Sequence, residues 1–145
     1  MATVEPALAH RLRLTLGRLS RRMRSVETNG MSWSQGAVLG RLENDGETTA
    51  AALAAAEGVR PQSMAATLDI LEGDGLVERR PDEKDRRQLR VSITEQGRTM
   101  VRSARASKEQ WLAQAIGKHL TCDEAEILRT AVDLLERLAE DEAKG

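Results

Sequence analysis

The sequence predicts a mainly α-helical fold with one small β-hairpin (α+β class), and three patterns support this prediction. Apolar residues recur at steps of three and four near both ends of the chain, which is typical of long amphipathic helices. Between positions 48 and 72, an Ala-rich segment, a glycine and a second apolar-periodic segment predict two short helices joined by a tight turn. Within 75–97, alternating apolar and polar residues on both sides of a charged turn predict the hairpin.

Length and composition favour a single domain spanning residues 1–145. The chain has 145 residues, 40% of them hydrophobic, which suits one modest core and not two. No segment approaches the roughly 18 apolar residues that cross a bilayer, and the N-terminus lacks a secretory pattern. The single cysteine, Cys122, excludes an intramolecular disulfide framework and agrees with a reducing compartment. We therefore expect a cytoplasmic protein with no membrane partner.

The two short helices form a helix-turn-helix pattern. The first is predicted from Thr48 to Glu57 and the second from Arg60 to Glu72. On the second helix Met64, Leu68 and Leu71 fall on one side, which predicts that this side faces the core. In helix-turn-helix proteins the second helix enters the major groove of DNA, so we name it the recognition helix.

The segment 75–97 predicts a hairpin with a basic tip. Apolar residues alternate with polar ones from Leu89 to Ile93, and Pro81 begins the charged turn. Between Arg79 and Arg90 there are six basic residues and three acidic ones, so the turn has a positive surplus that suits a polyanion. A helix-turn-helix followed directly by a two-stranded hairpin is the order of a winged helix, predicted over about residues 32–97.

Three motifs in this part of the chain resemble the MarR family of bacterial transcriptional regulators. Gly75-Leu76-Val77 leads into the hairpin, Asp85-Arg86-Arg87 matches an Asp-x-Arg motif at its tip, and Ile93-Thr94-Glu95-Gln96-Gly97 matches a hydrophobic-Thr-x-x-Gly exit. They occur in order and at matching spacing, and the similarity covers nearly the whole chain. The chain departs from the pattern at Ala66 and Ile70, where many relatives have arginine. Base or phosphate contacts are therefore not carried over to these two positions.

The resemblance and the residue types together predict contacts with double-stranded DNA. The resemblance places Arg87 in a narrow minor groove, with Asp85 orienting it or bracing the wing; a purely local Asp-Arg pair is the alternative. Long flexible cations such as Lys84 and Arg86 are expected near phosphates. On the recognition helix glutamine suits adenine and arginine suits guanine, while hydroxyls usually position the backbone. The predicted set is Ser34, Gln35, Arg60, Gln62, Ser63, Thr67, Lys84, Asp85, Arg86 and Arg87.

Two long amphipathic regions, predicted over about residues 5–28 and 98–142, favour a homodimer. A winged helix of about 70 residues buries little apolar surface, and these helices have no obvious partner within it. They can cover each other across a two-fold axis, which would present two recognition helices to a pseudo-palindromic site. An intramolecular helical bundle is the alternative. The predicted interface residues are Leu8, Leu12, Leu16, Leu19, Leu128, Leu134, Leu135 and Leu138.

A small-molecule site is a further prediction, suggested by the resemblance. MarR-like regulators commonly bind aromatic or phenolic acids between the dimer helices and the DNA-binding lobe. Trp33 beside Met31, with the guanidinium groups of Arg11 and Arg13, would suit an aromatic carboxylate. The alternative is that Trp33 is a core residue and the arginines are solvated. Cys122 lies in the first turn of the last predicted helix, and its acidic neighbours disfavour a thiolate.

The sequence thus predicts a sequence-specific DNA-binding transcriptional regulator, a repressor that binds its operator as a homodimer and is released by a small aromatic or phenolic ligand. One alternative is a winged-helix protein-interaction module without sequence-specific DNA binding; another is a redox-responsive regulator using Cys122. We expect no enzymatic activity, metal or cofactor, because the chain has one cysteine, two distant histidines and no phosphate-binding loop.

Overall fold

The computed structural model describes residues 5–26 and 30–140 of the chain, in two compact units that comprise residues 1–108 and 109–145. In the first unit the elements, in order, are α1 (Pro6–Arg24), α2 (Trp33–Asp45), β1 (Thr48–Thr49), α3 (Ala50–Glu57), α4 (Pro61–Gly73), β2 (Val77–Pro81) and β3 (Leu89–Ile93). The helix α5 (Glu95–His119) begins in the first unit and ends in the second, which also contains α6 (Cys122–Glu140). The predicted α+β fold class is confirmed.

The core of the first unit is formed by the helices α2, α3 and α4 together with the sheet and the first part of α5. The predicted inward side of the recognition helix, now α4, is confirmed, because Met64 is 3% exposed and both Leu68 and Leu71 are completely buried. The turn between α3 and α4 begins at Gly58, which has a φ of 64° and so ends α3 in the left-handed conformation. The remaining large side chains of the core are Val38, Leu39, Leu42, Leu53, Leu76, Val77, Val91, Ile93 and Val101.

The sheet has three antiparallel strands in the order β1-β3-β2, one more than the hairpin alone. Thr48 and Thr49, predicted as the start of the first short helix, instead pair with Val91 and Arg90 of β3. The hydroxyl oxygen of Thr49 then accepts a hydrogen bond of 3.1 Å from the amide of Ala52 and caps α3. The prediction of helix at these two positions was wrong, because β-branched threonine suits a strand and an N-cap better than a helix interior.

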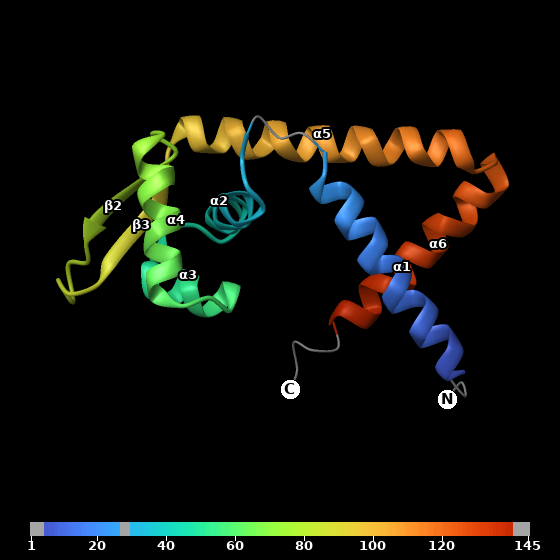
Figure 1. Cartoon of the computed structure of the whole chain (residues 1–145), viewed down its shortest axis with the longest axis horizontal. Coiled ribbons are helices and arrows are strands. Elements are labelled where there is room, and N and C mark those ends of the chain that lie inside the picture. Colours follow the sequence, from blue (N-terminus) through green and yellow to red (C-terminus); the bar gives the residue numbers. More distant parts are fainter. Residues whose placement is uncertain (1–4, 27–29, 141–145) are drawn as a thin grey trace. The chain divides into compact units, whose positions relative to one another are not determined.

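The hairpin of β2 and β3 projects its turn away from α2, α3 and α4 (Figure 1). Its register pairs Val77 with Ile93 and Pro81 with Leu89. Val91 and Ile93 are buried, as the period of two predicted, and fix one face of β3 to the core, whereas Leu89, expected on the same face, is 41% exposed beside the turn. The opposite face and the turn remain available to solvent.

The motifs that suggested the family resemblance connect the hairpin to α5. The hydroxyl of Thr94 donates a 2.7 Å hydrogen bond to the carbonyl oxygen of Gly75 and accepts one of 3.0 Å from the amide of Gly97. Gly75 has a φ of 73°, which favours glycine. A Cβ atom at Gly97 would overlap the backbone oxygen of Leu76 and lie 2.7 Å from Cγ1 of Ile93. The glycine-leucine-valine and Thr-x-x-Gly motifs therefore hold both ends of the hairpin at the start of α5.

The terminal helices α1 and α6 contain no buried residue, although both have apolar residues along one side. The predicted capping box of the last helix is confirmed, since the Thr121 amide donates to Glu124 Oε2 at 2.8 Å and the Glu124 amide donates to Thr121 Oγ1 at 3.2 Å. Positions 27–28 and 141–142 of the predicted terminal regions lie outside the described residues. No helix in the described part of the chain is both long enough and apolar enough to cross a membrane. The single domain 1–145 stays a prediction.

Candidate nucleic-acid interface

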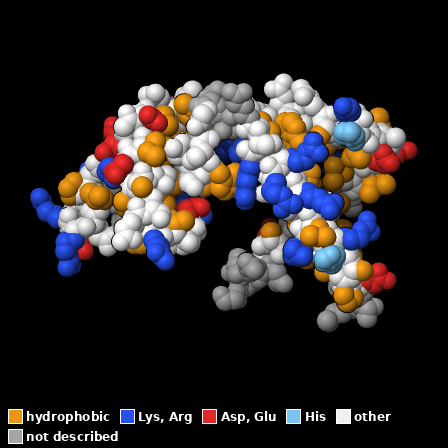
Figure 2. All heavy atoms as spheres, in the orientation of Figure 1, with side chains coloured by type: hydrophobic (Ala, Val, Ile, Leu, Met, Phe, Trp, Pro, Cys, Tyr) orange, Lys and Arg blue, Asp and Glu red, His pale blue; other side chains and the backbone are white. Residues whose placement is uncertain are grey.

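Basic side chains gather at the tip of the wing, the turn between β2 and β3 (Figure 2). The turn is held by its own hydrogen bonds: the Asp82 amide donates to the Gln88 carbonyl oxygen at 2.9 Å, and the Asp85 amide donates to Asp82 Oδ2 at 3.2 Å. Lys84, Arg86 and Arg87 are exposed on this turn. The tip is therefore a small ordered loop that presents cations to solvent.

Asp85 and Arg87 form the local pair expected from the Asp-x-Arg motif. Both the backbone amide and Nε of Arg87 donate to Oδ1 of Asp85, at 3.1 and 3.2 Å. The Arg87 side chain is nevertheless 92% exposed, so the pair orients the guanidinium without covering it. Among the described residues neither Lys84 nor Arg86 has an ion-pair partner.

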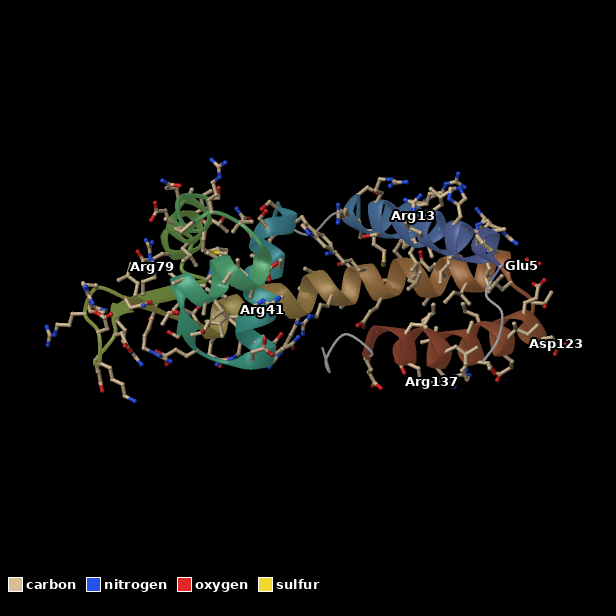
Figure 3. The ribbon with its side chains drawn as sticks, turned by 90° about the horizontal axis from the view of Figure 1, so that it is seen from below. Glu5, Arg13, Arg41, Arg79, Asp123 and Arg137 are labelled. Carbon is tan, nitrogen blue, oxygen red and sulfur yellow. The ribbon has the colours of Figure 1, made fainter. Side chains whose placement is uncertain are left out.

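The other three basic residues of the hairpin are held by carboxylates that precede it in the chain. Arg79 lies where β2 passes α4 (Figure 3) and binds Asp69 at 2.7 Å and Glu72 at 3.0 Å. Its side chain is only 16% exposed. The hydrogen bonds to Glu72 and Asp69 raise the pKa of Arg79, and the hydrogen bond from Arg79 lowers the pKa of Glu72. Arg80 and Arg90 both bind Glu47, at 2.6 and 3.1 Å.

The ion pairs reduce the number of basic residues on the hairpin that are available to a polyanion. Three of the six basic residues lie on the strands and bind carboxylates that precede the hairpin, and three lie on the turn. The partners Glu47, Asp69 and Glu72 precede the hairpin in the chain and were not predicted from the sequence. Their positions give no local signal, since the nearest of them lies seven residues before its arginine.

The recognition helix presents most of its predicted polar residues to solvent. Arg60 precedes α4 as its N-cap, and Gln62 and Ser63 are exposed in the first turn. Thr67 is half-buried, and its hydroxyl donates to the carbonyl oxygen of Ser63 at 3.1 Å. The structure thus brings Arg60, Gln62 and Ser63 to one end of an exposed helix, whereas the hydroxyl hydrogen of Thr67 is already used within it.

The two residues at the start of α2 that were predicted to contact DNA differ in how free their side chains are to do so. Ser34 is exposed. Gln35 is half-buried and completes a capping box with Ser32. The side-chain Oε1 of Gln35 accepts a hydrogen bond of 3.1 Å from the backbone amide of Ser32, and the backbone amide of Gln35 donates one of 3.2 Å to Ser32 Oγ. The cap fixes the side chain of Gln35 on its own helix, which leaves Ser34 as the better phosphate contact of the two.

A cavity of about 350 Å³ lies in the first unit between α2 and the start of α5. Two predicted ligand residues, Met31 and Trp33, line it, but Arg11 and Arg13 are not among the residues of its wall. Its cationic residues are instead Arg41, Arg105 and Lys108. The sequence could not indicate these residues, because their helices meet only in the folded unit.

Trp33 is 51% exposed, so the alternative in which it is a core residue is wrong for the single chain. Its indole ring is contacted by two cations: Arg24 lies 4.4 Å and Lys108 lies 4.9 Å from the ring centre. Arg41, labelled in Figure 3, donates to Glu57 Oε1 at 2.7 Å, and this hydrogen bond raises the pKa of Arg41. Arg105 binds Glu43 at 3.0 Å. Lys108 is thus the cavity cation in contact with the indole.

The predicted interface leucines are partly or largely exposed in the single chain. On α1 the exposed fractions are 59% for Leu8, 46% for Leu16 and 39% for Leu19. On α6 they are 52% for Leu134 and 63% for Leu138. The other three, Leu12, Leu128 and Leu135, are half-buried. Side chains of this kind on two long helices mark surfaces that a partner can cover.

The described residues contain no group of three or more His, Cys, Asp or Glu side chains that could hold a metal ion. Cys122 is the first residue of α6 and is exposed. Its exposure leaves the thiol accessible to an oxidant, as the redox alternative requires.

The fold and the basic wing define a winged helix-turn-helix protein, and comparison with known proteins gives its family. Residues 31–89 match the model of the MarR family. An uncharacterized HTH-type transcriptional regulator of Mycobacterium bovis is 38% identical over 142 residues, which is 97% of this chain and 99% of that protein. The chain belongs to the MarR family, whose members are transcriptional regulators and not enzymes.

Two solved structures illustrate the shared fold. A Pseudomonas aeruginosa protein described as a transcriptional regulator has a TM-score of 0.81 and 37% identity, over 92% of this chain and 95% of that one. A mutant MarR from E. coli, solved in complex with operator DNA, has a TM-score of 0.63 and 23% identity, over 90% and 94% of the two chains. At that identity the second match supports the fold alone.

Proposed function

We propose that the chain is a repressor that binds a pseudo-palindromic operator in double-stranded DNA as a homodimer, in the cytoplasm. The observation that supports this most directly is the arrangement of charge on the hairpin, where Arg79, Arg80 and Arg90 bind carboxylates that precede it in the chain, while Lys84, Arg86 and Arg87 are exposed on the turn. A wing of this kind beside an exposed recognition helix matches the geometry of a groove-reading domain. The structure of E. coli MarR in complex with operator DNA shows that a protein of this fold can bind an operator.

The homodimer is proposed from the terminal helices. The exposed leucines of α1 and α6 would bury apolar surface across a two-fold axis, and a dimer would carry two recognition helices. Two half-sites then lie roughly one helical turn of DNA apart, or 34–36 Å. Because the two half-site contacts would then be coupled, loss of the dimer interface would also lower the affinity for DNA.

The experiment for DNA binding begins with the bound DNA itself. Genomic fragments that co-purify with the protein are sequenced, and the shared site is titrated with protein at several salt concentrations, beside a scrambled duplex. We expect a preference for the recovered site and a steep fall of affinity with salt, because phosphate contacts release counterions. A weak, salt-insensitive interaction with both duplexes would instead support the protein-interaction module.

A small aromatic or phenolic acid is the effector that we propose for the cavity beside Trp33. The ring of such an acid can stack on the exposed indole, and its carboxylate can bind the ammonium group of Lys108. For the ligand to relieve repression, its binding must weaken the binding of the operator. The two binding events then share one coupling free energy, so the operator weakens the binding of the ligand by the same factor.

The effector is tested with a panel of phenolic and benzoic acids, using tryptophan fluorescence in a Trp111→Leu background so that Trp33 alone reports. We expect an acid that binds to lower the affinity of the protein for its operator. We expect Lys108→Gln to bind this acid more weakly, but to bind the operator as the wild type does when no acid is present. If no acid changes either signal, and an oxidant abolishes DNA binding only while Cys122 is present, the redox-responsive regulator replaces this proposal.

A further inference from the structure

The exposed side of α4 carries an apolar pair that the DNA contacts proposed above do not use. Ile70 is 51% exposed, although the neighbouring Leu68 and Leu71 are completely buried. Ala66 is also exposed, about one helical turn earlier. Residues four apart lie on the same face of a helix, so Gln62, Ala66 and Ile70 form one row along α4. An isoleucine left in water on this row forgoes the free energy that burial would provide.

The acidic residues of α4 are held to one side of this row. Asp69 and Glu72 bind Arg79 of β2, with N···O distances of 2.7 and 3.0 Å. Their charges are thereby paired with a cation, and the row itself contains no charged side chain. An uncharged row bordered by neutralised acids can approach a polyanion without the repulsion that free carboxylates would cause.

The chemistry of the base edges then selects what the apolar pair can recognise. In the major groove thymine presents a C5-methyl group beside its O4 acceptor, and no other base carries a methyl group there. An isoleucine has no polar group, so it discriminates between bases by covering that methyl group. Gln62 and Ile70 are separated by about 12 Å along the helix axis, which is roughly the length of three to four stacked base pairs. One helix can thus place both side chains against bases.

We infer that Ile70, with Ala66 beside it, is a specificity-determining residue that contacts the C5-methyl group of a thymine in each operator half-site. The inference rests on the proposed DNA binding. A competing role for Ile70 is packing against deoxyribose, which would add affinity without selecting a base. A second competing role is contact with another protein chain.

Deoxyuridine provides the test, because it differs from thymidine only by the missing methyl group. Each thymine of the operator found by co-purification is replaced in turn by deoxyuridine, symmetrically in both half-sites, and wild-type affinity is measured. We expect one thymine per half-site at which the replacement weakens binding about fourfold per half-site, as expected for one apolar carbon group removed from contact. The replacement is then repeated with Ile70→Ala and with the conservative variant Ile70→Val.

The decisive quantity is the coupling between residue and methyl group. We expect Ile70→Ala to bind the normal and the deoxyuridine operators equally at that position, and Ile70→Val to retain most of the difference. The inference is overturned if no deoxyuridine effect depends on residue 70, or if Ile70→Ala weakens the scrambled duplex as much as the operator. Because Ile70 is exposed, circular dichroism should show the variants folded, which excludes unfolding as the cause.

The same experiment separates this inference from the proposed function. Steep salt dependence and preference for the operator, measured with the wild type on unmodified DNA, test the proposed function alone. If those hold and the methyl coupling is absent, only the role of Ile70 is wrong. If the wild type binds no duplex selectively, both are wrong, and an exposed Ile70 is then better explained by a protein contact.

Discussion

Replacing Arg87 by alanine removes the most exposed guanidinium of the wing that has a defined orientation. Its side chain is 92% exposed, and the hydrogen bonds that orient it go to one carboxylate oxygen of Asp85. An exposed pair of this kind contributes about 0–1 kcal/mol, so we expect the free energy of unfolding to change by no more than about 0.5 kcal/mol. The variant therefore separates DNA binding from folding.

The expected loss of operator binding is much larger. A guanidinium placed in a groove contributes about 1–3 kcal/mol, which corresponds to roughly a 5- to 150-fold weaker dissociation constant for one wing. A homodimer that inserts both wings loses twice this free energy. Arg86→Ala should instead weaken the operator and a scrambled duplex alike, because a phosphate contact reads no sequence.

Fluorescence anisotropy with labelled operator measures these losses, and Arg80→Ala is the matched control. It removes the same group from the same hairpin, but this guanidinium lies on strand β2 and is bound to Glu47 at 2.6 Å. We expect a small effect on DNA affinity from this control. Unchanged operator affinity in Arg87→Ala, or equal losses in the two variants, would exclude the wing tip from the mechanism.

Asp85→Asn tells whether the carboxylate supports or opposes this contact. If Asp85 serves mainly to orient Arg87, the asparagine variant binds operator more weakly, and the loss disappears when Arg87 is already alanine. If its charge mainly repels phosphate, the variant binds more tightly at low salt. The hydrogen bonds to Oδ1 of Asp85 favour the first result.

Three further predictions concern stability and assembly. Gly97→Ala should lower the free energy of unfolding by about 1–3 kcal/mol or more in chemical denaturation, since a Cβ overlaps the Leu76 carbonyl; wild-type stability would contradict this. Replacing Leu134 and Leu138 together by Glu should split or unfold the homodimer, and a wild type that sediments as a monomer at micromolar concentration would refute the proposed interface. The pKa of Glu72 is lower in the folded chain than its unfolded value of about 4.3, so the ionised carboxylate stabilises the fold above that pH. This stabilisation is lost as the pH falls through the folded pKa. The wild type should therefore have a higher denaturant midpoint than Glu72→Gln, and this difference should shrink below about pH 4.

The parts of the fold that could be predicted are those with a local period. The buried row Met64, Leu68 and Leu71 and the alternation in β3 recur within a few residues, so the sequence indicates the side that faces the core. The strand Thr48–Thr49 could not be predicted, because two residues have no period and their partners in β3 lie more than forty positions later. Its pairing is decided by the folded unit, where β3 offers a free edge.

Some residues of the candidate site could likewise be predicted from the sequence, and others could not. The tip residues Lys84, Arg86 and Arg87 could be identified because a cationic turn needs no distant partner to be exposed. The surroundings of Trp33 could not, since Arg24 and Lys108 reach its ring from two other helices. The predicted arginines of α1 had the right charge but were selected by sequence position alone, which does not tell which side chains share a cavity.

Net charge is a poor guide to DNA binding in this chain because its acids are not distributed at random around the wing. The total is −1, which considered alone argues against a polyanionic partner. Yet Glu47, Asp69 and Glu72 are placed where they neutralise arginines on the strands of the hairpin. Each such pair removes an acid from the surface potential and stiffens the support of the tip. The acids that lower the net charge therefore help to present the cations that remain, and local charge after pairing is the quantity that bears on function.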